Sequence, residues 1–324
     1  MSTRLIDWRD LPYLHNYRHQ TVYLNNILLL TGGSMQVFCS LVSSVVPARG
    51  VLTMISTDAQ AAEQPLMGQA IHRAGDEFAY LSFLAPTELI TDDGCLDLLE
   101  SLALQAGRRG AMRLLADVDE HSPALEALRL AGYAAYTRQR TWRLPDTLPG
   151  IPIATPLRVA TEQDWLPIQM LYNAVVPTLV KQVEAAFTPR RRGLVHYQDV
   201  KLLAYIELHY GISGICARPI IHPDVEEIGA DLAALFNGLP GLPLRRSRPM
   251  YICVTHYQSW IESAIEELGG QPDPRKVLMA KHLTVRQKEM RAVSLPVLEQ
   301  GRPETFALSS AGESIKIYDT ISRN

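Results

Sequence analysis

The sequence has little cysteine and no cysteine-rich motif, and this absence argues against two classes of protein. Its 324 residues include four cysteines, Cys39, Cys95, Cys216 and Cys253, and no two of them form a Cys-x-x-Cys pair. Disulfide-stapled secreted domains and structural zinc sites typically have clustered cysteines, so we expect neither. Reduced, mostly buried thiols are typical of a cytoplasmic protein, and we predict that location.

Strong net charge and long apolar segments are also missing. The formal net charge of -3 at pH 7 gives no electrostatic basis for binding nucleic acid or an anionic membrane. No apolar run approaches the roughly 20 residues that cross a bilayer, and the opening MSTRLIDWRDLP lacks the apolar core of a signal peptide. Hydrophobic residues make up 47% and charged residues 20%, the mixture of a globular chain. We therefore predict a globular protein with no nucleic-acid or membrane partner.

A proline-rich segment divides the chain. The stretch LPDTLPGIPIATP, from Leu144 to Pro156, contains four prolines and a glycine between two structured regions, a composition typical of an interdomain linker. We predict an N-terminal domain over residues 1–144, a linker over 145–156, a C-terminal domain over 157–286 and a tail over 287–324. The short apolar pieces of the tail leave two alternatives, an added edge strand or disorder.

Both halves follow one plan. Arg4 precedes Asp10 by the same spacing as Arg158 precedes Asp164, and each pair leads into a helical pattern. The patterns that follow predict a mixed α/β (α+β) fold, with the same order of strands and helices in each half. In the first half, strands are predicted at 50–57, 65–72, 78–85, 113–118 and a closing strand at 133–144, with helices near 96–107 and 123–131. In the second half, strands are predicted at 194–198, 202–210, 214–222, 250–255 and a closing strand at 276–285, with helices at 227–235 and 260–268.

One segment points to a family. In HSPALEALRLAGYAAYTRQRTWRL, residues 121–144, an alanine- and leucine-rich helical pattern ends at Gly132-Tyr133 before the closing strand. This resembles the helix-to-last-strand motif of the GCN5-related N-acetyltransferase (GNAT) superfamily, and WIESAIEELGG, residues 260–270, looks like a weaker copy. The resemblance covers roughly 1–144 and 157–286. It implies two tandem acyl-CoA N-acyltransferase-like domains, with acetyl-CoA or another acyl-CoA as cofactor. It also implies transfer to an amine, which is a small molecule, a protein N-terminus or a lysine.

The resemblance also implies where the cofactor lies. In this superfamily the pyrophosphate of CoA rests on backbone N–H groups at the start of the helix after the fourth strand, where the helix end is positive. The positions in this chain that match the end of that strand and the helix start are Leu84, Ala85 and Gly94 in the first half, and Ile221, His222, Gly229 and Ala230 in the second.

Both loops depart from the family pattern of Arg or Gln followed by Gly-x-Gly or Gly-x-Ala. In HPDVEEIGADL, residues 222–232, Glu226 stands at the Arg/Gln position and Asp231 at the second small residue. The first-half loop has Leu89 and Asp92 at the corresponding Arg/Gln and glycine positions. Carboxylates repel phosphates, although they also suit the first turn of a helix. The alternative is therefore that the protein is not an enzyme but binds a ligand or a partner. In that case it has kept the acetyltransferase fold and lost the binding site for the CoA pyrophosphate.

The second-half loop also has residue types that bind metals. His222, Asp224, Glu226 and Glu227 carry suitable side chains. Because acidic helix starts are common, we predict no metal.

Few residues are candidates for catalysis. Many members of the superfamily use a tyrosine as general acid, but the matching positions are Leu128 and, in the second half, Ile265, which cannot donate a proton. Glu207 and His209 are two residues apart on a predicted strand and so share one face. Such a pair can deprotonate an amine, directly or through water. The alternative is that this face of an antiparallel sheet is simply solvated.

Overall fold

The structure is a computed structural model that describes residues 2–33, 50–57, 65–145, 157–184, 193–225, 229, 232 and 248–283. The predicted linker apart from Pro145, the predicted tail and most of the predicted helix 227–235 lie outside these residues. Residues 1–285 form one compact unit. The domain boundaries at 144 and 157 stay a prediction.

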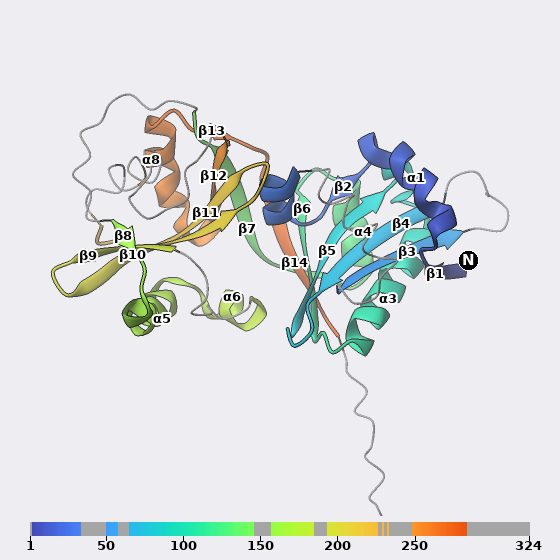
Figure 1. Cartoon of the computed structure of the whole chain (residues 1–324), viewed down its shortest axis with the longest axis horizontal. Coiled ribbons are helices and arrows are strands. Elements are labelled where there is room, and N and C mark those ends of the chain that lie inside the picture. The colour runs from blue at the N-terminus through green and yellow to red at the C-terminus, as the bar shows by residue number, and fades with distance from the viewer. Residues whose placement is uncertain are drawn as a thin grey trace, which may run out of the picture. The chain divides into compact units, whose positions relative to one another are not determined.

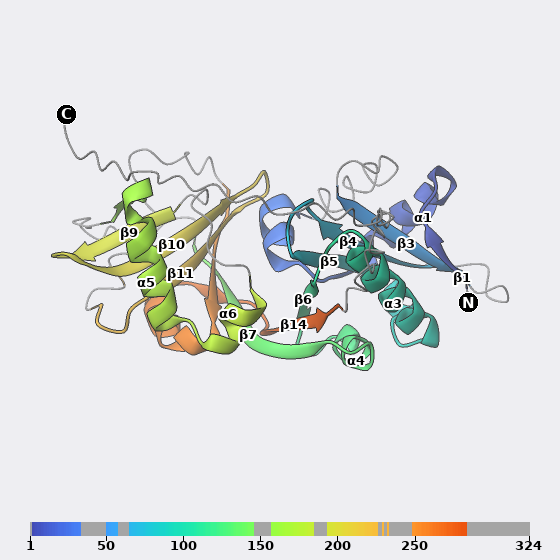
Figure 2. The same cartoon turned by 90° about the horizontal axis from the view of Figure 1, so that it is seen from below.

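The predicted strands of the first half are all present (Figure 1). Its elements are β1 (Ser2–Leu5), η1 (Trp8–Asp10), α1 (Leu11–Asn16), η2 (Tyr17–His19), β2 (Val22–Tyr23), a helical stretch over 26–33, β3 (Val51–Thr57), β4 (Leu66–His72), β5 (Phe78–Ala85), η5 (Thr87–Leu89), α3 (Asp93–Arg108), β6 (Arg113–Asp119), α4 (Pro123–Leu130) and β7 (Ala134–Arg143). The sequence did not predict β2. Helix α3 packs on β3 and β4 (Figure 2).

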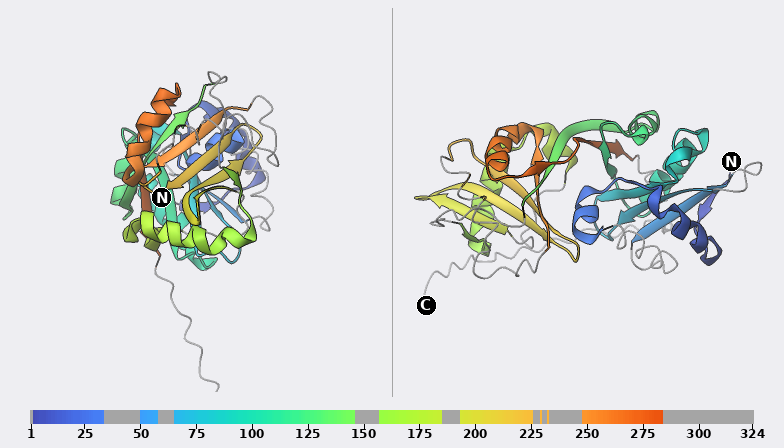
Figure 3. Two further views of the ribbon diagram at one scale, coloured as in Figure 1. Left: turned by 90° about the vertical axis from the view of Figure 1, so that its left-hand side faces the viewer. Right: turned by 90° about the horizontal axis from the view of Figure 1, so that it is seen from above.

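The second half also contains its predicted strands. Its elements are β8 (Arg158–Val159), η6 (Glu162–Asp164), α5 (Trp165–Val175), α6 (Thr178–Val183), β9 (Gly193–Gln198), β10 (Lys201–Tyr210), β11 (Ile215–Ile221), β12 (Met250–Thr255), η7 (His256–Ile261), α8 (Glu262–Glu267), β13 (Gln271–Pro272) and β14 (Lys276–His282). Helices α5 and α8 lie on opposite faces of this half's strands (Figure 3). Among the described residues, no helix is long and apolar enough to cross a membrane.

The N-terminal segments of the two halves contain the same ion pair. The guanidinium of Arg4 binds both carboxylate oxygens of Asp10 at 2.7 Å, and Arg158 binds both oxygens of Asp164 at 2.7 and 2.6 Å. In each half the aspartate is buried, and hydrogen bonds from the arginine lower the pKa of its carboxyl. The repeat in the sequence is therefore a repeat in the structure.

The closing strands are exchanged between the halves. One mixed sheet of 14 strands has the main order β1-β3-β4-β5-β6-β14-β7-β12-β11-β10-β9-β8. Strand β14 lies between β6 and β7, and β7 pairs with β12 of the second half. The prediction that each half is closed by its own last strand was therefore wrong. Alternation in the sequence shows that a segment is a strand, but it does not show which edge that strand joins.

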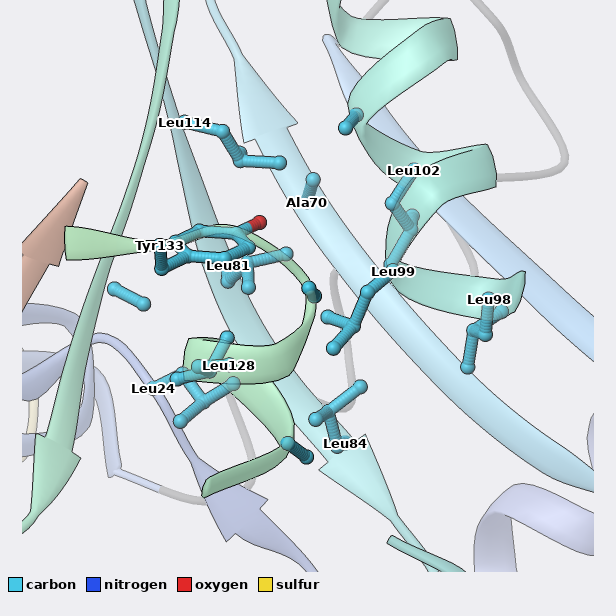
Figure 4. Close-up of a cluster of buried hydrophobic side chains, with 14 of the residues drawn as sticks. Leu24, Ala70, Leu81, Leu84, Leu98, Leu99, Leu102, Leu114, Leu128 and Tyr133 are labelled. Carbon is cyan, nitrogen blue, oxygen red and sulfur yellow. The ribbon is translucent and has the colours of Figure 1, made fainter. Parts of the chain in front are cut away.

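Each hydrophobic core includes side chains from the exchanged strand. The first-half core, part of which is shown in Figure 4, is built around α3, α4 and β5, and it includes Val277 and Met279 of β14. The second-half core includes Trp142 of β7 together with the following Leu144. Exchange therefore makes each half depend on the other for a central strand and for part of its buried apolar surface.

The motif around Gly132 has the local geometry that its sequence predicts. The hydroxyl of Ser122 caps α4 by accepting a hydrogen bond from the backbone N–H of Ala124 at 3.2 Å. Gly132 ends the helix with φ +84°, a conformation that favours glycine.

Candidate functional site

Each half contains two parallel strands that separate partway along their length. Strands β5 and β6 pair over Phe78–Tyr80 and Arg113–Leu115, and β11 and β12 pair over Ile215–Ala217 and Met250–Ile252. Beyond these residues the two strands of each pair diverge. Diverging strands leave backbone N–H and C=O groups that need other partners, so an extended amide-containing ligand can bind there by strand addition.

In the first half, the edge of β5 that faces the opening is paired with β2. Val22 lies opposite Leu84, and Tyr23 lies opposite Phe83, in antiparallel register. At the end of this ladder, the backbone N–H of Thr87 donates to the carbonyl of Gln20 at 2.9 Å. The chain's own residues therefore take the position of an added strand along β5.

Leu24 joins this segment to both diverging strands. Its N–H donates to the carbonyl of Ser82 on β5 at 2.9 Å, and its carbonyl accepts from the N–H of Asp117 on β6 at 2.8 Å. The Leu24 side chain is 1% exposed and packs in the first-half core, close to Leu84 and Leu128 (Figure 4). The opening of the first half is therefore filled by both the backbone and a side chain.

Asn26 continues the same connection. Its backbone N–H donates to Oδ2 of Asp117 at 3.0 Å, and its side-chain Nδ2 donates to Oγ1 of Thr141 on β7 at 2.8 Å. Burial raises the pKa of the Asp117 carboxyl, while the hydrogen bond from Asn26 opposes that shift. The inserted segment is thus fixed to β6 and to the exchanged strand β7.

In the second half, the described residue that bonds the free edge of β11 does so with its side chain and not as part of a strand. Gln258 lies in η7 just after β12 and is 1% exposed. With its amide oriented to satisfy its partners, Nε2 donates to the carbonyl of Pro219 at 3.0 Å and Oε1 accepts from the N–H of Ile221 at 2.9 Å. Pro219 has no N–H of its own.

A polar cluster lies on β11 where the two strands begin to diverge. Arg218 Nη2 donates to Glu184 Oε2 at 3.0 Å, and the Tyr136 hydroxyl donates to Glu184 Oε1 at 3.2 Å. Burial lowers the pKa of Arg218, but the carboxylates of Glu184 and Glu207 outweigh it and raise that pKa well above its usual value. Because Tyr136 belongs to β7, the first half contributes a residue to the site of the second. Sequence reasoning missed these residues because they lie far apart along the chain.

The predicted pair Glu207 and His209 is brought together. Glu207 Oε1 lies 3.3 Å from His209 Nε2, and Glu207 stands opposite Arg218 in the register of β10 and β11. The alternative that this face is solvated was wrong, because α5 packs over it and leaves Tyr205 and Glu207 buried. The His209 side chain remains 27% exposed, although its Nε2 atom is buried. The role of the pair as a base stays a prediction.

The predicted cofactor loops are only partly described. Leu84 and Ala85 are fully buried, and Gly94 is buried in the first turn of α3. In the second half, His222 Nδ1 lies 3.2 Å from Asp224 Oδ2, and a Cβ on Gly229 would meet nothing within 4 Å.

Some of the predicted residues of these loops fall outside the part of the chain that the structure describes. They are Glu226, Glu227, Ala230 and Asp231. Within the described part of the chain, no cluster of His, Cys, Asp and Glu could hold a metal ion.

The positions where the family tyrosine would act are apolar and buried. Leu128 and Ile265 are both 0% exposed, and each belongs to the core of its own half.

Comparisons with known proteins bear on the fold. No protein-family model matches the sequence, and no curated protein matches it significantly. A GCN5-related N-acetyltransferase from Sphaerobacter thermophilus matches with a TM-score of 0.50 and 10% identity, over 87% of this chain and 95% of that chain. A protein from Pyrococcus horikoshii with a provisional acetyltransferase name matches with a TM-score of 0.50 and 10% identity, over 89% and 91% of the two chains.

A tandem GNAT protein from the clavulanic acid biosynthesis pathway also covers most of the chain. It matches with a TM-score of 0.48 and 15% identity, over 87% of this chain and 98% of that chain. The chain has the GNAT fold, with its elements repeated in tandem around one mixed sheet. At these identities the likeness shows the fold alone.

Proposed function

We propose that the protein is an acyl-CoA-dependent N-acyltransferase, with acetyl-CoA as the first cofactor to test, and that its acyl-CoA groove is the opening between β11 and β12. The observation that carries the proposal is the divergence of these parallel strands after Ala217 and Ile252, within a GNAT fold. In the described residues, Gln258 bonds this edge in place of a strand.

The residues of this opening suit the pantetheine arm of CoA. The N–H of Ile221 and the carbonyl of Pro219 face the Gln258 amide, so the amide groups of a pantetheine arm can replace it with similar hydrogen bonds. His222, Gly229 and Ala230 follow on the chain and would contact the pyrophosphate. The bound cofactor would supply an activated thioester.

The neighbouring polar residues would bind and deprotonate the acceptor amine. Glu207 and His209 would accept the proton that the acceptor amine loses, and His209 would pass it to solvent through its exposed edge. Glu184, held by Arg218 and Tyr136, would bind a positively charged acceptor. Since Leu128 and Ile265 cannot donate a proton, the departing thiolate would be protonated by water.

Calorimetric titration with acetyl-CoA and longer acyl-CoAs, followed by an assay of thiol release with a panel of amines, tests this proposal. We expect saturable binding and amine-dependent release. Glu207→Gln and His209→Ala should each lower kcat/KM by about 100-fold, within the usual range for a general base. His121→Ala, an exposed histidine on a loop, is the matched control and should have no effect. A folded protein that binds no acyl-CoA would refute the proposal.

The second candidate is a non-catalytic binding protein, and a specific observation favours it. Pro219 removes a backbone donor from the edge of β11, and Gln258 already satisfies two groups there. Glu226 and Asp231 would add repulsion at the pyrophosphate. For this candidate we expect no heat of binding with any acyl-CoA, while the protein unfolds cooperatively.

A further inference from the structure

We infer that the segment Gln20–Asn26 permanently occupies the acyl-CoA groove of the first half, so that each chain binds one acyl-CoA molecule, in the second half. The number bound rests on the function proposed above. The occupation of the first groove rests on the contacts of the segment alone.

The backbone hydrogen bonds of this segment follow the diverging strands from end to end. Thr87 donates to Gln20, β2 pairs with β5, and Leu24 bonds to both Ser82 and Asp117. These are the backbone groups of β5 and β6 that an extended ligand would need. A pantetheine arm could enter only after the whole ladder had been broken.

The side chains of the segment are part of the protein interior. Leu24 and Asn26 are 1% and 3% exposed, and Leu24 belongs to the first-half core. Displacing the segment would expose the Leu24 side chain to water. It would also remove the partner that Asn26 provides to Asp117 and Thr141. The segment therefore behaves as a structural strand and not as a lid.

The second half differs in what bonds the strand edge that faces the gap. Among the described residues, the buried side chain of Gln258, and not a backbone ladder, bonds the groups of Pro219 and Ile221. A change of its rotamer would free both groups without breaking any strand pairing. In the part of the chain that the structure describes, both halves have a gap between diverging strands, but a ligand must break a backbone ladder in the first half and displace a side chain in the second.

Residue-level hydrogen exchange on the full chain tests the inference in two arms. In the free protein, the amides of Leu24, Thr87 and Asp117 should exchange as slowly as those of the central strands. With saturating acetyl-CoA, new protection should appear over 215–222 and 250–258, and none over 78–87 or 113–119. Calorimetry should give one site per chain.

The outcomes separate this inference from the proposed function. Fast exchange at Leu24 in the free protein, new protection over 78–87, or two sites per chain would overturn the occupied-groove inference and leave the function standing. Slow exchange at Leu24 with no acyl-CoA binding in either half would support the occupied groove while refuting the proposed function.

Discussion

The substitution Gln258→Ala tests whether a ligand lies along β11. The Gln258 side chain satisfies the carbonyl of Pro219 and the N–H of Ile221 in a buried place. Truncation leaves both groups without that partner, and each such loss costs about 1–3 kcal/mol. We expect the free energy of unfolding to fall by about 2–4 kcal/mol, since a water entering the space restores part of the bonding.

The same change should strengthen acyl-CoA binding. In the wild type, a pantetheine arm must displace the Gln258 amide before it bonds to β11. In the variant, the groups of Pro219 and Ile221 are already available, and the ligand regains the lost hydrogen bonds. If about 1.4 kcal/mol of the destabilisation is recovered on binding, Kd falls by about tenfold.

Denaturant unfolding and calorimetric titration of the same preparations measure both effects. Gln198→Ala is the matched control, because Gln198 is an exposed glutamine at the end of β9. It should change neither the free energy of unfolding nor Kd. If Gln258→Ala lowers stability while acyl-CoA affinity stays the same or weakens, the ligand does not use this edge, and the placement of the groove is wrong.

Three further predictions follow from the loop, the ion pairs and the strand exchange. The double change Glu226→Arg with Asp231→Gly should tighten CoA binding by about tenfold or more, most strongly at low salt. Pantetheine, which lacks the pyrophosphate, should show no gain in titration. Asp164→Asn should cost about 1–3 kcal/mol of unfolding free energy near pH 7. Because hydrogen bonds from Arg158 lower the pKa of Asp164, that contribution is present above the unfolded pKa of about 3.9 and is lost as pH falls through the folded pKa, so denaturation curves of wild type and variant should converge in acid. Finally, residues 1–145 and 157–324 should fold only when co-expressed, and size-exclusion chromatography should recover them as one complex, because each half lacks a central strand alone; two independently folded halves would contradict the exchange.

The sequence by itself determined the elements and their repetition. Alternating and continuous apolar runs predicted the major strands of both halves, and the Gly132-Tyr133 motif predicted the end of α4. The equal spacing of Arg and Asp at the start of each half predicted similar N-terminal segments, and in the structure both segments contain the same Arg–Asp ion pair. These signals are local, since periodicity, helix caps and turns depend on residues within a few positions of one another.

Tertiary structure alone decided which strands meet and what fills each opening. Strand β14 inserts beside β6, and β2 is too short to give a periodic signal although its backbone closes the first groove. Glu207 lies in a strand whose alternating sequence predicts a solvated face, yet its side chain is buried on the face that α5 covers. Arg218 forms an ion pair with Glu184, which is far from it along the chain. Such pairings depend on which strand edges and apolar surfaces are still unpaired when distant segments come together, and the residues within a short stretch of sequence do not determine this.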